Sequence, residues 1–243
     1  VGQRSALGNS EAILQYIRGV RGNEIAQGGA FRDREEVLGS FINSRATYVG
    51  VPGANLFQGR TFQGATIYPA FATSNAGRSA VLFAAANDGM LHAFRVVDKV
   101  DGFGNVLEPA GREIFAFVPS ASLAAGLNQI VDPAFEHRYF VDGQLAVGQV
   151  YTETPLSAVK AWRTVLIGTM GRGGRSVFAL DITNPENIQL LWEKTAVQIP
   201  ALGNVIGDPV IAQIADGDWR VLLPNGPNGN SGESALVMIS VGS

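Results

Sequence analysis

The chain has 243 residues, of which 46% are hydrophobic and 16% are charged, and its formal net charge is −3. The hydrophobic content excludes disorder for most of the length, and the slight excess of acidic residues removes the broad electrostatic attraction that drives nucleic-acid binding. The absence of cysteine excludes disulfide frameworks and thiolate metal sites, and no run approaches the roughly 18 consecutive apolar residues of a transmembrane helix.

Residues 1–45 are predicted to form a helical lead-in segment. Ser10 is a favourable N-cap for a helix over residues 11–18, whose apolar side chains repeat at helical spacing, and a glycine follows as a stop. A further helical turn or two is expected over residues 32–43. The chain starts at Val1, without an initiator methionine or a signal-peptide pattern, so we expect a fragment of a longer protein.

From residue 46 onward the pattern changes to short apolar runs separated by glycine, asparagine, aspartate and proline, which is typical of strands and turns. Thirty glycines without a collagen-like period support the same interpretation, because glycine serves tight turns. One helix is expected over residues 120–131, directly after Pro119. We therefore expect residues 46–243 to form a β-domain with a helical insertion.

An internal repeat narrows the fold class. Three segments each contain an apolar strand, a glycine-containing turn and a second apolar strand: residues 81–94, 164–182 and 220–241. In the first segment, Asp88 and Gly89 are predicted to form a two-residue type I′ turn, in which both residues take positive φ. The later turns are longer, at residues 170–175 and 225–233, as expected for surface loops that vary on a constant scaffold.

Hairpins that recur in this way are typical of β-propeller blades, which usually contain four strands and ~40–45 residues. The wider spacing in this chain requires insertions between strands. The fold is therefore predicted to be all-β, a partial β-propeller, and a β-sandwich with three unrelated hairpins is the alternative. The segments NDGMLHAF (87–94) and FALDITNPENIQLLWE (178–193) resemble the repeats of quinoprotein-type propellers, and this resemblance implies quinoprotein-like blades. Trp192 is expected to pack between neighbouring blades.

Seven motifs follow one another along nearly the whole chain. They are ILQYIRG (13–19), FRDREEVLG (31–39), AANDGMLHAF (85–94), EIFAFVPSA (113–121), HRYFVDG (137–143), TVLIGTMGRGGRSVFALDIT (164–183) and GDPVIAQIADGDWRVLLPNG (207–226). In this order they resemble the C-terminal propeller of the PilY/PilC-type family, the type IV pilus tip-associated biogenesis factors and adhesins. No single motif is specific, and the resemblance depends on their order.

This resemblance implies a non-enzymatic protein that supports type IV pilus assembly, twitching motility and surface attachment. It implies minor pilins, the pilus tip and host or abiotic surfaces as partners, and a location at the cell surface or outer membrane after export through the periplasm. Calcium is the cofactor of the family, but its Asp-rich loop is expected in a later blade, so this chain is not expected to bind the ion. A quinoprotein-like oxidoreductase and a periplasmic scaffold for outer-membrane assembly are the alternatives.

No catalytic or cofactor-binding residue is predicted. The candidate metal ligands have oxygen atoms but lack the alternating spacing of a calcium loop, so a solvated turn is the favoured interpretation: they are Asp98, Asp101 and Asn105. His92 lies in the middle of a predicted strand and is expected to be packed and hydrogen-bonded rather than to bind zinc.

The predicted interaction residues lie in two of the hairpin turns. The run of residues 171–175 has neither the lysine nor the following helix of a phosphate-binding loop, so an exposed loop is expected. The residues predicted to contact partners are Arg172 and Arg175 in this turn, and Asn228 and Asn230 in the last one.

Overall fold

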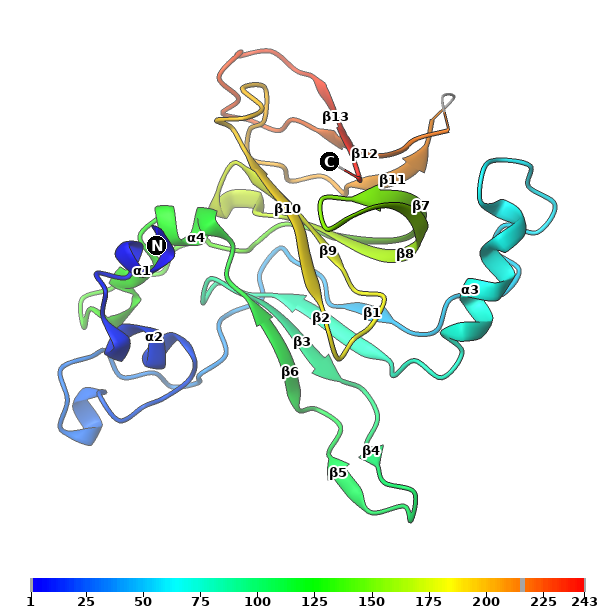
Figure 1. The fold of residues 1–243 in the computed structure, drawn as a ribbon. Coiled ribbons are helices and arrows are strands. Elements are labelled where there is room, and N and C mark those ends of the chain that lie inside the picture. Colours follow the sequence, from blue (N-terminus) through cyan, green and yellow to red (C-terminus); the bar gives the residue numbers. More distant parts are fainter. Residues whose placement is uncertain (1, 215–216, 243) are drawn as a thin grey trace.

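The computed structural model describes residues 2–214 and 217–242, whose longer strands form three antiparallel sheets, here called blades 1 to 3 (Figure 1). Blade 1 has the strand order β1-β2-β3-β6, with β1 (Thr47–Val49), β2 (Val81–Ala85), β3 (Leu91–Arg95) and β6 (Glu113–Phe117). Blade 2 has the order β10-β9-β8-β7, with β7 (Leu145–Thr154), β8 (Ser157–Thr169), β9 (Ser176–Asp181) and β10 (Gln189–Thr195). Blade 3 has the order β11-β12-β13, with β11 (Val210–Gln213), β12 (Trp219–Pro224) and β13 (Leu236–Ser240).

The three predicted hairpins are confirmed, and each provides the second and third strands of a blade: β2–β3, β8–β9 and β12–β13. The first strand of blade 2, β7, lies against β1 and β11, which are the first strands of the two neighbouring blades. The blades are therefore arranged about a common axis, as in a propeller, rather than in the two facing layers of a sandwich. The sheets of the described residues do not close into a ring, which confirms the predicted partial propeller.

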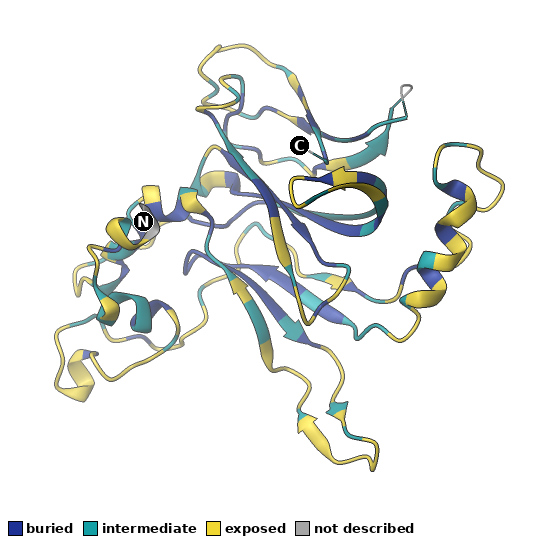
Figure 2. Ribbon diagram, viewed as in Figure 1, coloured by how far each residue is buried: buried dark blue, intermediate teal, exposed yellow. Residues whose placement is uncertain are grey.

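Blade 2 lies between blades 1 and 3, and its central strands are buried on both faces. Alternate residues of a strand point to opposite sides of the sheet, so one strand contributes to two cores. In β9, Val177 and Ala179 pack in the core shared with blade 3, whereas Phe178 and Leu180 pack in the core shared with blade 1. Figure 2 shows this buried centre in dark blue. Trp192 of β10 lies in the first of these cores, and its indole nitrogen donates to a backbone carbonyl beyond β13 at 2.9 Å, so its predicted position between blades is confirmed.

The turn between β2 and β3 differs from its prediction. Gly89 has a φ of +96°, but Asp88 is not among the non-glycine residues with positive φ, so the turn is not of type I′. The Ala86 amide donates to the Met90 carbonyl at 2.9 Å and closes a three-residue loop, in which Gly89 takes the left-handed position. The Asp88 carboxylate accepts from the Met90 amide at 3.1 Å, which helps to fix this longer loop.

Gly89→Ala is expected to lower the free energy of unfolding by about 2 kcal/mol, through strained backbone and a steric clash. A Cβ atom at this position would meet a side-chain carbon of Leu127 at 2.5 Å. Gly111→Ala is the matched control, because Gly111 has a φ of +82° but nothing within 4 Å of the added atom. Urea unfolding of both variants would show the difference, and equal losses would contradict the clash with Leu127.

The lead-in segment contains α1 (Gly2–Ala6), α2 (Glu11–Ile17) and the 3₁₀ turn η1 (Ile25–Gln27). The helix predicted over residues 11–18 is confirmed as α2, and the Ser10 hydroxyl accepts from the Ile13 amide at 3.3 Å as its N-cap. The division of the chain between residues 45 and 46 remains a prediction.

The helix predicted over residues 32–43 is wrong, because this segment forms an irregular strap. Its backbone bonds to groups that are distant in the sequence: the Arg32 amide donates to the Val131 carbonyl at 2.8 Å, and the Gly39 amide to Asp88 Oδ2 at 2.8 Å. The apolar side chains that suggested a helix do not face a core. They are 39–45% exposed: Val37, Leu38 and Phe41.

The connection between blades 1 and 2 contains α4 (Ser120–Ala124) and η3 (Leu127–Val131). The single helix predicted over residues 120–131 is therefore divided, and the division falls at Gly126, which has a φ of +85° and caps the second turn. Apolar side chains of α2 and of the connection share a small core: Tyr16, Ile17, Leu127, Ile130 and Phe140. The lead-in segment is thereby attached to this connection.

The up-and-down strands place their connections on two faces of the array. One face, here called the turn face, carries the β2–β3, β8–β9 and β12–β13 turns, the lead-in segment, and the short helices α4, η3 and η4 (Gly171–Gly173). The other, here called the insertion face, carries the β1–β2 connection with η2 (Ala65–Ile67) and α3 (Tyr68–Ser74). It also carries residues 96–112, here called the arm, which contain the separate hairpin β4 (Lys99–Val100) and β5 (Val106–Glu108). The two faces give two places where partners could bind.

The β1–β2 connection bridges the three blades on the insertion face. Phe57 stacks on Trp162 of blade 2, with ring centroids 4.8 Å apart, and lies edge-on to Trp219 of blade 3 at 5.8 Å. The Trp162 indole nitrogen donates to the Gly64 carbonyl at 2.7 Å. A segment that starts in blade 1 therefore braces blades 2 and 3. No helix in the described part of the chain is long and apolar enough to cross a membrane.

Candidate functional site

The turn face brings three of the four predicted interaction residues together. Arg175, at the end of the β8–β9 turn, donates from Nη1 to the Asn228 carbonyl at 3.0 Å and to Asn230 Oδ1 at 2.6 Å. Asn228 has a φ of +67°, so the loop bends sharply where it meets the arginine. The exposed turns of blades 2 and 3 are thus linked by direct hydrogen bonds, and the predicted residues form one surface.

Arg172 lies on the same face but makes a different contact. Its guanidinium carbon is 5.4 Å from the centre of the Tyr139 ring, which belongs to the blade 1–blade 2 connection. Between Arg172 and the blade 3 loop, Asn204 donates from Nδ2 to the Gly171 carbonyl at 2.9 Å and accepts from Asn228 Nδ2 at 2.9 Å. Asn204 therefore connects both turns through its amide group. The sequence interpretation did not single out Asn204 or Tyr139.

The loop that bears Asn228 and Asn230 is supported from inside by Asn225, which is 5% exposed. Its backbone amide donates to the Ala235 carbonyl, while its side chain accepts from the Ala235 amide and donates to the carbonyls of Ala201 and Glu233. A side chain that satisfies three backbone groups holds an irregular loop in one shape. This loop lines an open recess of about 690 Å³.

A second recess, of about 370 Å³, lies where the first strands of the blades begin. Its lining includes Asn43 before β1, Asp142 and Gln144 before β7, and Ile206 before β11, together with Arg172. Asp142 is 1% exposed and accepts from Asn43 Nδ2 at 2.6 Å, so its carboxylate serves to hold the lead-in segment at the axis. Arg45 and Arg172 are exposed charged side chains in the lining of this recess, and both are accessible to a partner.

Arg175→Ala is expected to release the blade 3 loop rather than to unfold the protein. The loss of two hydrogen bonds at an exposed position should lower the free energy of unfolding by about 1 kcal/mol. Amide hydrogen exchange in residues 226–232 should become at least tenfold faster, while exchange in blade 1 stays unchanged. Arg172→Ala is the control, since its side chain makes no bond to this loop; equal exchange rates in both variants would contradict the role of Arg175.

The candidate metal ligands form hydrogen bonds within the arm. Asp101 Oδ1 accepts from the amides of Phe103 and Asn105 at 2.8 and 2.9 Å, and Oδ2 accepts from Asn105 Nδ2 at 2.8 Å. The hydrogen bonds from Asn105 hold the pKa of Asp101 below its ordinary value. Asp98 accepts from the Ala110 amide at 2.7 Å, at the root of the arm. The carboxylate oxygens of Asp98 and Asp101 thus accept from amides of the arm and stabilise its turns.

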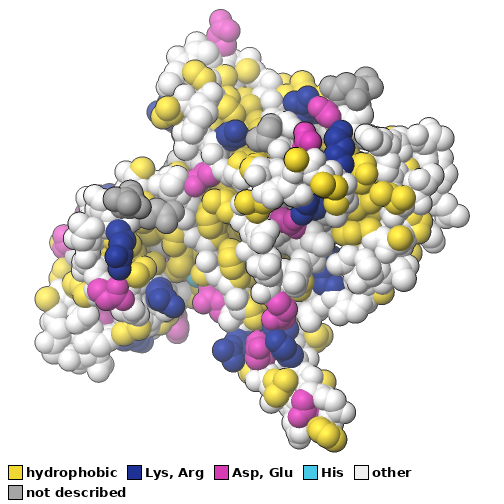
Figure 3. All heavy atoms as spheres, in the orientation of Figure 1, with side chains coloured by type: hydrophobic (Ala, Val, Ile, Leu, Met, Phe, Trp, Pro, Cys, Tyr) yellow, Lys and Arg dark blue, Asp and Glu magenta, His cyan; other side chains and the backbone are white. Residues whose placement is uncertain are grey.

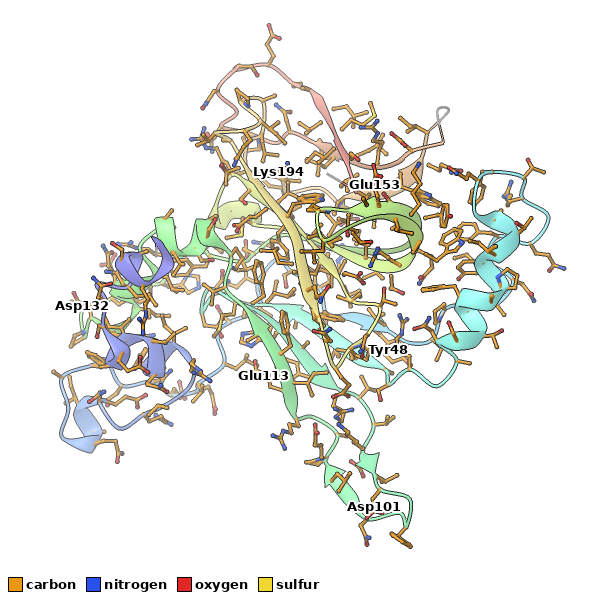
Figure 4. All side chains as sticks on the ribbon, viewed as in Figure 1. Tyr48, Asp101, Glu113, Asp132, Glu153 and Lys194 are labelled. Atoms are coloured by element: carbon orange, nitrogen blue, oxygen red, sulfur yellow. The ribbon has the colours of Figure 1, made fainter. Side chains whose placement is uncertain are left out.

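The described residues also contain no group of three or more His, Asp and Glu side chains that could hold a metal ion. His92 is 3% exposed and hydrogen-bonded, as predicted. Its Nε2 lies 3.0 Å from Asp88 Oδ2, and its Nδ1 contacts Glu113 of β6, which Figure 4 labels. Burial alone would lower the pKa of His92, but the hydrogen bonds to the two carboxylates outweigh it and raise the pKa to about 9. An enclosed imidazolium that stays protonated at neutral pH serves as a structural group.

The fold and the turn face define a partial β-propeller in which hydrogen bonds join the exposed turns of blades 2 and 3. Comparison with protein families gives a match between residues 38–241 and the family described as the PilY1 beta-propeller domain. The chain belongs to this family, which confirms the resemblance that its motifs indicated.

Individual relatives agree with this assignment. The chain is 42% identical over 241 residues to a protein of Xylella fastidiosa named type IV pilus biogenesis factor PilY1 homolog, and the match covers 99% of this chain and 18% of the relative. It is 32% identical over 230 residues to the type IV pilus biogenesis factor PilY1 of Pseudomonas aeruginosa, with 93% of this chain and 18% of the relative covered. The chain thus spans less than a fifth of the length of these relatives.

A solved structure supports the same fold. The crystal structure of the Pseudomonas aeruginosa PilY1 C-terminal domain aligns with a TM-score of 0.54 and 35% sequence identity. The alignment covers 72% of this chain and 30% of that domain. The propeller-like arrangement of the blades therefore agrees with a related experimental structure.

Proposed function

We propose that this chain is the propeller part of a type IV pilus biogenesis protein and that it acts without catalysis, by presenting loops to other pilus components. The observation that carries this proposal is the match over 99% of the chain to a protein named for pilus biogenesis. The turn face supports it, because its polar side chains bond to neighbouring loops and so hold a stable surface. A stable surface of this kind suits recognition.

Minor pilins and the pilus tip are the proposed partners on the turn face, with host or abiotic surfaces as targets of the assembled pilus. The protein would act at the cell surface or outer membrane after export through the periplasm. Calcium would bind outside these residues, since Asp98, Asp101 and Asn105 support only local turns. The oxidoreductase and outer-membrane scaffold alternatives have no specific observation in their favour.

The proposal is tested in a piliated bacterium that lacks its own copy and expresses the full-length protein. Arg172→Glu reverses an exposed charge on the turn face, and Lys160→Glu does the same at an exposed position of β8 at the insertion face. We expect the first variant to reduce surface pilin, measured in the sheared fraction, at least twofold, together with twitching and adherence. The second variant should leave all three unchanged.

Two outcomes would contradict the proposal. Unchanged piliation, twitching and adherence in the deletion strain would contradict the proposed pilus function itself. Equal effects of Arg172→Glu and Lys160→Glu would contradict the assignment of this function to the turn face, because both variants change the net charge by the same amount.

A further inference from the structure

The arm is an insertion that exposes apolar side chains far from any core. Blade 1 uses residues 96–112 to connect its last two strands, whereas blade 2 makes the equivalent connection with residues 182–188. Phe103, at the end of the arm, is 94% exposed. Its apolar neighbours along the arm are 52–58% exposed: Val97, Val100, Val106 and Leu107. Figure 1 shows the arm projecting away from the blades, and a run of exposed apolar residues on such a projection indicates an interaction site.

The root of the arm is fixed to the neighbouring blade by four charged side chains. Arg95 at the end of β3, which is 2% exposed, donates to Glu108 of β5 at 3.0 Å and to Glu186 of the β9–β10 turn at 2.8 Å. Lys99 of β4 donates to the same two carboxylates at 3.1 and 3.3 Å. An isolated two-stranded hairpin is only marginally stable in water, so this network supplies the order that the arm needs. Figure 3 shows the cluster of blue and magenta side chains at the root.

The tip is fixed as well. Asp101, which Figure 4 labels at the end of the arm, accepts from the Phe103 and Asn105 amides and from the Asn105 side chain. Gly104 takes a φ of +84° to complete the turn. Phe103 is therefore carried on a shaped support, so little conformational entropy remains to be lost when a partner covers it.

The distribution of apolar side chains indicates the shape of the partner. Phe103 is 94% exposed, so nearly every side of its ring is open to a partner, and Val106 and Leu107 of β5 are both more than half exposed. The register between β4 and β5 shifts at Lys99/Val100 and leaves Leu107 without a paired residue, which bends the hairpin behind the tip. A concave recess can cover most sides of the Phe103 ring, whereas a flat surface covers only one.

The charges of the arm indicate what borders that recess. Asp101 stays ionised beside Phe103, because its hydrogen bonds favour the charged form. A carboxylate in this place is repelled by anionic phospholipid and attracted by basic side chains. A second copy of this chain, with 21 acidic and 18 basic residues, offers no excess of positive charge.

We infer that the arm is a docking knob, which inserts Phe103 into an apolar recess with a basic rim on a different protein. The arm lies on the insertion face, opposite the turn face that the proposed pilus function uses. An experiment can therefore contradict the docking role of the arm without contradicting the proposed pilus function, and the reverse.

The test uses the full-length protein in living cells, with the photocrosslinking amino acid p-benzoylphenylalanine in place of Phe103. The control carries the same amino acid in place of Val197, an apolar residue that is 88% exposed on the turn face. We expect one heterologous protein product from position 103 and none of that mass from position 197. Mass spectrometry should locate the bond among apolar residues flanked by lysine or arginine.

A second pair of variants measures the contribution of the tip. With the crosslinker in place of Val106, Phe103→Ser should lower the yield at least fivefold, as expected for an interface anchor, while Val197→Ser leaves it unchanged. Both variants should unfold at the parental temperature, because both side chains are solvent-exposed. Equal yields would overturn the inference, as would products that join two points of one chain, two copies of the chain, or the chain and phospholipid.

Discussion

At pH 6, His92→Gln is expected to lower the free energy of unfolding by about 3 kcal/mol, and most of this difference should be gone at pH 10. The imidazole ring is enclosed between Asp88, in the β2–β3 turn, and Glu113, on the outermost strand of blade 1. These hydrogen bonds stabilise the protonated ring more strongly than burial destabilises it, and the pKa rises from 6.5 to about 9.

The direction of the pH dependence follows from this raised pKa. A folded-state pKa above the unfolded value means that folding favours the protonated ring. The stabilisation is therefore complete below pH 6.5 and is lost as the pH rises through about 9. Urea unfolding of the parent and of His92→Gln at intervals from pH 6 to pH 10 measures it. Parallel pH profiles of the two proteins would contradict this assignment.

The two carboxylates should contribute unequally. The Asp88 side chain is 9% exposed, whereas that of Glu113 is 46% exposed and its interaction is weakened by solvent. Asp88 also accepts from the Gly39 amide at 2.8 Å, and so joins the strap of residues 32–43 to blade 1. Asp88→Asn should therefore lower the free energy of unfolding at pH 7 more than Glu113→Gln does. A larger loss for Glu113→Gln would mean that the exposed Glu113, rather than the buried Asp88, forms the stronger ion pair with His92.

The hairpins of blades 1 and 2 could be predicted from the sequence because most of their paired strand residues are buried on both faces, and the blade 3 hairpin because its strands are apolar even where Leu236 and Met238 are exposed. Such strands appear as continuous apolar runs, and each turn between them needs glycine, so both signals are local. In β9, Val177 to Leu180 alternate between two cores, yet all four are apolar, and no partner had to be known to recognise the strand.

The strap of residues 32–43 shows where local signals fail. Its apolar side chains repeat at helical spacing, but its backbone is bonded to Asp88 and Val131, which are far along the chain. The type I′ turn was wrong for a related reason. Asp88 has the right residue type, but its carboxylate bonds to Gly39, Met90 and His92, and the loop has three residues instead of two.

The candidate site could be predicted in part. Exposed arginine and asparagine in hairpin turns follow from residue type, whereas their contacts depend on turns of adjacent blades that converge on one face. Asn204 gave no signal, because a single asparagine in a connection looks like any other turn residue. The exposure of Phe103 could not be predicted from the sequence either, since an aromatic residue between two short apolar runs is also typical of a buried turn.

Arg95→Met is expected to lower the free energy of unfolding by about 3 kcal/mol and to release the arm from blade 2. The guanidinium is almost fully buried and makes two charge-assisted hydrogen bonds, to Glu108 and Glu186. Methionine keeps most of the apolar volume, so the loss reports these bonds rather than a cavity. Lys99→Met is the matched control, because Lys99 binds the same two carboxylates but is 39% exposed, and it should cost less than about 1 kcal/mol.

Acid titration gives an independent check of the same network. The hydrogen bond from Arg95, followed by that from Lys99, holds the pKa of Glu186 below its ordinary value of 4.5. A lowered folded-state pKa stabilises the fold above pH 4.5, and this contribution is lost as the pH falls through the lower folded value. The difference between the parent and Arg95→Met should therefore shrink on acidification, and hydrogen exchange in the arm should be fast in the variant already at pH 7. Equal losses for Arg95→Met and Lys99→Met, or an arm that stays protected without Arg95, would mean that the hairpin is ordered by its own turn and not by its attachment to blade 2.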